Sequence, residues 1–342
     1  MRTLLLLILI LICAPSAHAV DLEGSEPVAA KKTKKTKKTK KQKAPPEEPP
    51  AEAAKTAGGL AFGWAHDSRV HVTEEVVKKG NTTVQEYWIT LSPRPDGNIT
   101  VSYSDFAFLS INGTEVTPEM KGRLGALETM TGAIPDLVIT PEGVMVGLEG
   151  MDAMITEVIT FLRDVEKTDP QVLASTEAML RSPQMEQVLQ GSAQTAWNSW
   201  AGDWVAMDLA PGETWEGEIE SASPGKTQPI TMTHHGEEAE FPGKVHLSYT
   251  TTMDKDLAMP LLMPLIEQIA AAGGAKDEDG FTKLVAEADI SIALNVRTIT
   301  DPATLRPVAA FTEKTVVMKL ESAGVDQTQV ESHAYRFAWP EE

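Results

Sequence analysis

Cysteine is nearly absent from this chain of 342 residues, which contains only Cys13. That residue lies in an N-terminal segment that we expect to be removed, so the mature chain would form no disulfide bonds and offer no thiolate nucleophile. Long apolar runs are also missing, because no stretch after Ile12 reaches the roughly 18 apolar residues that a membrane-spanning helix needs. We therefore expect no transmembrane segment in the mature chain.

Signatures of catalysis are missing as well. The sequence contains no G-x-S-x-G, no H-E-x-x-H and no glycine-rich loop of the kind that holds phosphates. We therefore assign no catalytic residue and no cofactor, and we favour a binding protein over an enzyme. Triads and carboxylate pairs assemble in space and not in sequence, so an exported hydrolase stays open as a third hypothesis.

One cluster has the residue types of a metal site: His234 and His235, followed by Glu237, Glu238 and Glu240. Adjacent residues of a strand point to opposite faces, so both histidines reach one ion only if the chain turns there. The spacing also matches no zinc motif. We interpret the cluster as a solvated hairpin tip and predict no metal site.

The N-terminus carries the clearest targeting pattern. Residues 1–19 combine Arg2, an apolar run at Leu4–Ile12 and small residues that end in Ala17-His18-Ala19. This combination is typical of a cleaved export signal. We therefore expect an exported bacterial protein, periplasmic or secreted.

Residues 20–59 look like a tether. A lysine-rich repeat with threonine spacers is followed by a stretch rich in proline, glutamate and alanine, and such segments stay disordered because they bury no apolar surface. The tether is either a spacer without specificity or a docking segment for an anionic envelope surface, where each lysine contributes on the order of 1 kcal/mol at low salt. The docking residues would be Lys31, Lys32, Lys34, Lys35, Lys37, Lys38, Lys40, Lys41 and Lys43.

The remaining chain, residues 60–342, has the opposite charge. Residues 1–59 hold 11 of the 30 Lys and Arg and 6 of the 49 Asp and Glu, which leaves residues 60–342 with 19 basic against 43 acidic groups, a formal charge of −24. So acidic a domain repels phosphate backbones, and we expect it not to bind nucleic acid.

Two periodicities alternate along residues 60–342. A period of two predicts strands within 60–116 and an extended pair at Leu137–Ile139 and Val144–Val146, whereas helical spacing marks much of 118–206. The predicted helices are one from Pro118, then Gly150–Asp164, Asp169–Leu180, Pro183–Trp200 and Pro260–Ala272, and the later strands are Thr214–Ser221, Gln228–His234, Lys244–Met253, Ala286–Thr300, Pro307–Glu321 and Val325–Trp339.

This order predicts an α+β fold with an antiparallel sheet and helices packed on one of its faces. A curved, half-barrel-like sheet is one form of it. The globular domain, residues 60–342, is either a single body or two related halves, 60–206 and 207–342. The second interpretation depends on the similarity of Gly97–Tyr103 to Gly243–Tyr249.

The stretch Ala288–Leu320 resembles the half-barrel envelope carriers of the LolA and LppX type. It reads as two long strands joined by a turn that contains Asp301, Pro302, Thr304 and Pro307. The resemblance implies a curved sheet wrapped around helices, with an apolar cavity between them for acyl chains.

Two sets of side chains are candidates for such a cavity. Trp197 and Trp200 share a helix face with Trp204, and the flexible thioethers of methionine suit an adaptable apolar pocket. Packing of the helices onto the sheet is the competing interpretation for both sets. The candidate ligand-binding residues are Trp197, Trp200, Met151, Met154, Met259 and Met263.

Taken together, these patterns favour an exported non-enzymatic protein that binds an apolar ligand, such as a lipid, or an envelope component. The alternative is a structural or interaction protein displayed on the basic tether, which would dock on an anionic envelope surface.

Overall fold

The computed structural model describes residues 60–64, 68–205, 207–220, 226–259, 263, 266, 278–320 and 325–340. The predicted export signal and tether lie outside the described residues, as does most of the predicted helix Pro260–Ala272.

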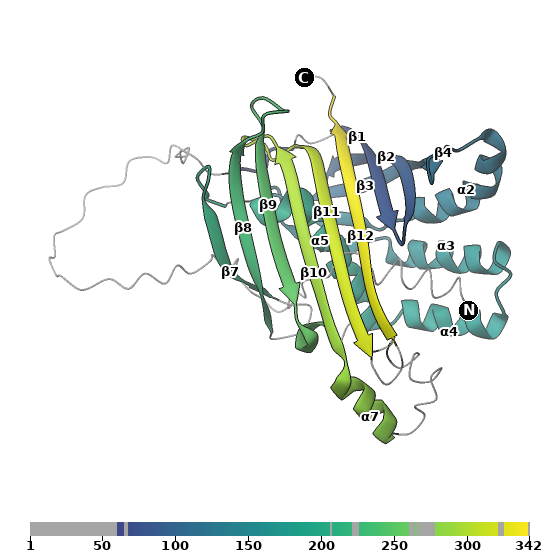
Figure 1. Ribbon diagram of the computed structural model, residues 1–342. Helices are drawn as coiled ribbons and strands as arrows, with labels where there is room; N and C mark the ends of the chain where they lie inside the picture. The colour runs from purple at the N-terminus through teal and green to yellow at the C-terminus, as the bar shows by residue number, and fades with distance from the viewer. Residues whose placement is uncertain are drawn as a thin grey trace, which may run out of the picture.

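A single sheet of twelve strands organises the chain, and it is antiparallel, as predicted (Figure 1). Its order is β6-β5-β3-β2-β1-β12-β11-β10-β9-β8-β7, with β4 paired to β3, and the sheet stays open because its ends, β6 and β7, do not pair with each other. The strands are β1 (Arg69–Lys78), β2 (Asn81–Pro93), β3 (Ile99–Ile111), β4 (Thr114–Glu115), β5 (Asp136–Ile139), β6 (Met145–Glu149), β7 (Thr214–Glu220), β8 (Thr227–Glu237), β9 (Val245–Met253), β10 (Asp289–Thr300), β11 (Pro307–Leu320) and β12 (Val325–Ala338).

The sheet bends along β2 and β3. The register shifts between Val84 and Gln85 and again between Glu86 and Trp88, and Asp105 on β3 has φ 56°. Such bulges add a residue to one strand and increase the local twist. As a result β3 crosses steeply behind β1 and β12 in Figure 1, and the sheet has a concave side.

The first and last strands meet in the middle of the sheet. β1 pairs with β12 from His71 opposite Ala338 to Lys78 opposite Glu331. Residues 69–149 therefore build one side of the sheet and residues 214–338 the other. The segments Gly97–Tyr103 and Gly243–Tyr249 lead into β3 and β9, the third strand of a meander on each side. A common origin of the two sides stays a prediction.

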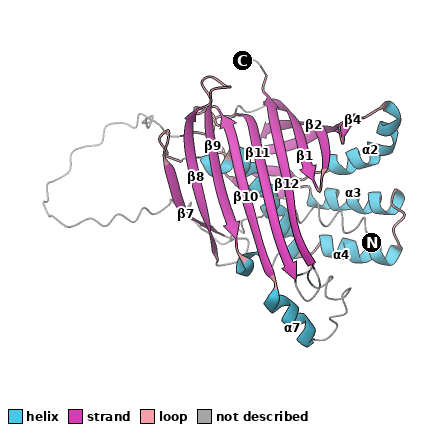
Figure 2. Cartoon of the chain, viewed as in Figure 1, coloured by secondary structure: helices cyan, strands magenta, loops and turns pink. Residues whose placement is uncertain are grey.

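The helices lie on one face of the sheet (Figure 2). We call this the inner face. α5 crosses behind the strands, whereas no described helix covers the opposite, outer face in Figure 1. The helices are α2 (Pro118–Gly132), α3 (Met151–Asp164), α4 (Pro170–Leu180), α5 (Pro183–Trp200), the 3-10 turn η1 (Gly202–Trp204) and α7 (Glu278–Glu287). No described helix is both long and apolar enough to cross a membrane.

Local sequence explains where α4 and α5 begin. Asp169 accepts a hydrogen bond from the Gln171 amide at 2.8 Å, and Ser182 accepts one from the Met185 amide at 3.3 Å. In both helices a proline follows the cap, where its missing N–H costs nothing.

The predicted bounds agree with the matching strands and helices to within three residues, but α7 was not predicted. The alternation in the sequence predicts a strand from Ala286, whereas α7 continues to Glu287 and β10 begins at Asp289. Leu284 is buried and Phe281 is partly buried against the sheet, so packing stabilises a helix that begins in acidic and glycine residues.

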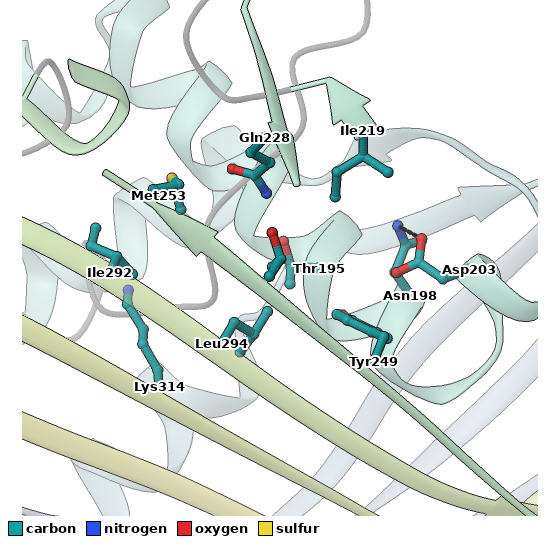
Figure 3. Close-up of a pocket in the computed structure, with 11 residues that line it drawn as sticks. Thr195, Asn198, Asp203, Ile219, Gln228, Tyr249, Met253, Ile292, Leu294 and Lys314 are labelled. Carbon is teal, nitrogen blue, oxygen red and sulfur yellow. Dashed lines mark hydrogen bonds between the residues drawn. The ribbon is translucent and has the colours of Figure 1, made fainter. Parts of the chain in front are cut away.

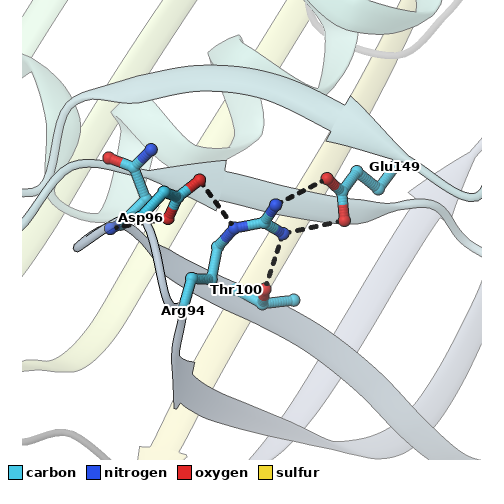
Figure 4. Close-up of polar contacts among 5 residues, drawn as sticks. Arg94, Asp96, Thr100 and Glu149 are labelled. Atoms are coloured by element: carbon cyan, nitrogen blue, oxygen red, sulfur yellow. Dashed lines mark hydrogen bonds and ion pairs between the residues drawn. The ribbon is translucent and has the colours of Figure 1, made fainter.

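An arginine ties one end of the sheet together. Arg94, in the turn after β2, donates to both carboxylate oxygens of Glu149 on the edge strand β6, at 2.8 and 2.9 Å (Figure 4). It also contacts Asp96 at 3.3 Å and Thr100 at 3.2 Å. The hydrogen bond from Arg94 lowers the pKa of Glu149. This paired contact holds β6 against the turn two strands away.

Buried apolar side chains form three clusters. The tryptophan cluster surrounds Trp197, Trp200 and Trp204 beneath α5 and η1. The methionine cluster lies at the other end of the inner face and contains Met253, Leu257, Met259, Ile266, Leu284, Ile290, Ile292, Met318 and Leu320. The helical cluster joins α3, α4 and α5 and contains Met154, Ile155, Val158, Leu162, Leu180, Met185 and Leu189.

Candidate functional site on the inner face

Charged side chains interrupt the apolar inner face between the tryptophan and methionine clusters. On β11, Ala310 belongs to the tryptophan cluster and Met318 to the methionine cluster, and Lys314 lies midway with only 7% of its surface exposed. Every second residue of a strand lies on the same face of the sheet, so the Lys314 side chain is on the same face as Ala310 and Met318. We call the charged group here the polar band. Its members are Glu74 and Lys78 on β1, Glu331 and His333 on β12, and Lys314 on β11.

Four members of the polar band form a chain of alternating charge. His333 donates from Nδ1 to Glu74 Oε1 at 2.7 Å, and its Nε2 lies 3.4 Å from Glu331 Oε1. Lys78 Nζ lies 2.9 Å from the other oxygen of Glu331. The register places Lys314 directly opposite Glu331 on the neighbouring strand. Each carboxylate therefore lies next to at least one cation.

The two carboxylates determine the charge of His333. Burial by itself lowers the pKa of this imidazole, but hydrogen bonds to Glu331 and Glu74, together with their negative charges, raise it to about 9. The pKa of Glu331 is lowered in turn: burial raises it, and the contacts with His333 and Lys78 outweigh that effect. His333 therefore stays protonated at neutral pH, which makes it unsuited to act as a general base.

Glu74 is 7% exposed and has a second donor beside His333. Gln85 Nε2 donates to its Oε2 at 2.8 Å. Burial, followed by the negative charge of Glu74, raises the pKa of Tyr87 and of Tyr335 well above 10. A buried carboxylate whose two oxygens each accept a hydrogen bond is held in one position.

A narrow cavity opens beside the polar band, between α5 and strands β7 to β11 (Figure 3). With its open mouth it holds about 410 Å³, but its width admits only about one water molecule. One side of the lining is apolar and the other polar. The residues that line this first cavity are Thr195, Asn198, Asp203, Ile219, Gln228, Tyr249, Thr251, Met253, Ile292, Leu294 and Lys314.

Some of the polar groups that line the first cavity form hydrogen bonds with one another. Asn198 Nδ2 donates to Asp203 Oδ1 at 2.7 Å (Figure 3). Burial, the charge of Asp203 and a hydrogen bond to it raise the pKa of Tyr249. Gln228 Oε1 is buried and has no hydrogen-bond partner among the described residues. An unpaired buried acceptor costs free energy, and a donor brought by a ligand or a water would recover it.

The predicted tryptophans lie in the core beneath α5. Trp197 is fully buried and donates from Nε1 to the Gly143 carbonyl at 2.7 Å, and Trp200 packs edge-on against Tyr335 and Phe337. Neither lines the first cavity, although Asn198, between them in the sequence, does.

The predicted methionines divide between two places. Met154 is buried in the helical cluster and Met151 packs against it. Met259 is buried in the methionine cluster and Met263 packs against that one. The six candidate ligand-binding residues are thus spread over three clusters and do not line one cavity. Lys31 to Lys43 lie outside the described residues.

The histidine pair takes up the two orientations expected for a strand. His234 is buried and its Nδ1 accepts from the Gly236 amide at 3.0 Å, whereas His235 is exposed and stacks on His246 at 4.4 Å. No group of three or more metal-ligating side chains is found among the described residues.

Sequence reasoning missed the polar band, although one signal was present. In β12 the inward positions read Glu331, His333, Tyr335 and Phe337, so charge replaces aromatic rings on one face halfway along the strand. The partners could not be found in this way, since Glu74 is 259 residues from His333.

Comparisons with known proteins give little further guidance. No family model matches the chain, and no curated protein does so. A solved structure described for lipid–protein interactions in lipovitellin is similar over 80% of this chain, with 9% sequence identity and a TM-score of 0.37. The match spans about a quarter of the length of that protein (25%). The likeness to LolA and LppX carriers stays a prediction.

Proposed function

We propose that this protein is an exported, non-enzymatic binding protein that holds a small amphipathic or apolar molecule on the inner face of its open sheet. The first cavity is the observation that carries the proposal. Ile219, Ile292 and Leu294 form its apolar side, and polar groups line the other. Ligand sites in proteins commonly have this mixture of apolar surface and a few placed polar groups.

Binding requires side chains to move, because the cavity admits only about one water molecule. Two of the lining residues are suited to this. Met253 and Lys314 have long unbranched side chains, which change rotamer more readily than branched or aromatic ones. An apolar chain that displaces Met253 would continue into the methionine cluster, to which this residue belongs.

The chemistry of the polar band supports binding over catalysis. Its histidine is held protonated between two carboxylates, and Lys78 is paired with one of them. These groups can fix the position of a polar ligand group through charge and hydrogen bonds.

Displacement of a fluorescent fatty acid from residues 20–342 tests the proposal. Leu294→Trp fills the first cavity and is expected to weaken probe binding at least tenfold. Ala293→Trp is the matched control, because Ala293 is exposed on the outer face of the same strand and should leave binding unchanged. Circular dichroism of both variants verifies that they fold. Absence of a displaceable site in the wild-type protein, or equal binding by both folded variants, would contradict the proposal.

A further inference from the structure

Gln228 on β8 has a buried oxygen without a hydrogen-bond partner. Its side chain lines the first cavity and the residue is 2% exposed, and Oε1 finds no donor among the described residues. An amide oxygen accepts hydrogen bonds in water, so burying it without a donor costs free energy. Such an oxygen in the wall of a cavity is a place where a bound molecule can supply the missing donor.

The hydroxyls beside Gln228 determine which way its amide is turned. Thr195 and Thr251 line the same cavity, and each donates its hydroxyl hydrogen to a backbone carbonyl, at 3.0 and 2.7 Å. A hydroxyl has one hydrogen, so these two oxygens can only accept from other groups. In Figure 3 the amide nitrogen of Gln228 points toward Thr195, which brings a donor to an acceptor, and the amide oxygen points toward Met253.

The polar side of the first cavity presents several acceptors. Besides Gln228 Oε1 and the two threonine hydroxyls, it contains the carboxylate of Asp203, which accepts from Asn198 Nδ2 at 2.7 Å. The ammonium group in the lining, that of Lys314, comes from β11, three strands away from Gln228. A molecule bound beside Gln228 is therefore recognised best through a group that donates.

The donor that fits here is uncharged. Gln228 lies opposite Ile219 on the edge strand β7, and its oxygen points toward Met253 (Figure 3). Moving an ammonium group from water to a place beside these two apolar side chains costs more free energy than one amide oxygen returns. A hydroxyl or an amide N–H loses much less on leaving water and still forms the hydrogen bond.

We propose that the molecule in the first cavity carries a hydroxyl or an amide N–H that donates to Gln228 Oε1, with an apolar chain attached to it. This inference rests on the proposed function, because it requires a molecule bound in that cavity. Met253 belongs to the methionine cluster, so a chain that displaces this side chain begins next to the donor and continues into apolar surroundings. Long-chain alcohols and fatty amides have this arrangement.

The test uses two matched pairs of competitors for a fluorescent fatty acid on residues 20–342. Oleyl alcohol and its methyl ether differ in an O–H, and oleamide and N,N-dimethyloleamide differ in their N–H groups. The quantity measured is the ratio of the two affinities within each pair, compared between the wild type and Gln228→Met. Methionine keeps the length of the side chain and has no amide, so the ratio should shift about tenfold toward the methylated partner in this variant.

Thr231→Val is the matched control. Thr231 lies on the outer face of the same strand, so the ratios should equal those of the wild type. Comparing ratios removes the effects of the extra methyl groups on hydrophobicity and size, which act equally in every variant. Gln228→Leu serves if Gln228→Met fails to fold, and circular dichroism verifies the fold of each variant.

The outcomes separate the inference from the proposed function. Binding of the competitors with the same ratios in the wild type and in Gln228→Met would overturn the inference, since Oε1 would then receive no donor from the ligand, and it would leave the proposed function standing. Displacement of the probe by none of the four would overturn the proposed function, and the inference with it. A shift in one pair alone would support the inference and assign the donor as a hydroxyl or as an amide.

Discussion

His333 on the last strand donates a hydrogen bond to Glu74 on the first strand, with 2.7 Å between Nδ1 and Oε1. The two residues are 259 positions apart in the sequence and meet because β1 and β12 pair at the centre of the sheet. Together with Glu331 and Lys78 they place a buried row of charges between two apolar clusters.

The protonated state of His333 should make the protein less stable in mild alkali. Its pKa is about 9 in the folded protein and about 6.5 in an unfolded chain, so the stabilisation is complete below pH 6.5 and is lost as the pH rises through 9. The free energy of unfolding should fall by on the order of 3 kcal/mol over this interval. Urea unfolding at a series of pH values measures it.

His333→Gln is the comparison for that measurement. The variant should be less stable than the wild type at pH 6.5 and should lose most of the decline toward pH 9, since glutamine does not titrate. A decline of equal size in both proteins would show that other groups cause it.

The hydrogen bond of Trp197 should distinguish it from Trp200. Both indoles are buried on α5, but only Trp197 Nε1 has an acceptor, the Gly143 carbonyl, whereas Trp200 Nε1 has no partner among the described residues. Trp→Phe removes similar volume at each position and leaves an unpaired carbonyl only in Trp197→Phe. That variant should lose about 1 to 2 kcal/mol more than Trp200→Phe in chemical denaturation. Equal losses would contradict the assigned role of this bond.

The basic tether should bind anionic surfaces in a salt-dependent way. Replacing the nine lysines of residues 31–43 by glutamine is expected to abolish binding of residues 20–342 to vesicles that contain anionic lipid at low ionic strength. Vesicles of zwitterionic lipid are the control and should bind neither protein. Co-sedimentation measures the bound fraction, and binding that survives the replacement would rule out docking through these lysines.

The sequence correctly predicted the helices and strands that depend on residues close together in the chain. The starts of α4 and α5 follow from Asp169-Pro170 and Ser182-Pro183, in which a capping side chain precedes a proline. The long alternation in residues 307–338 likewise predicted β11 and β12 and the antiparallel character of the sheet. α7 was not predicted because it begins with acidic residues and a glycine, and its stability comes from the packing of Leu284.

The site depends on pairings that the sequence does not contain. Trp197 and Trp200 share a helix face, as expected, but that face packs against β12 and the turn between β5 and β6. The residues of α5 that line the first cavity are Thr195 and Asn198. Lys314 belongs to the polar band because the pairing of β11 with β12 places it opposite Glu331. Residues at helical spacing can be grouped from sequence, whereas the neighbours of a strand depend on the order of the sheet.

The most direct test of the account is to identify what accompanies the protein in its own exported fraction. Residues 20–342 would be purified from that fraction and analysed by native mass spectrometry, before and after extraction with organic solvent. We expect an amphipathic or apolar molecule in a ratio of about one to one, which is lost on extraction and absent from Leu294→Trp. A folded wild-type protein that carries no such molecule, and takes up none when oleate is offered, would contradict the account.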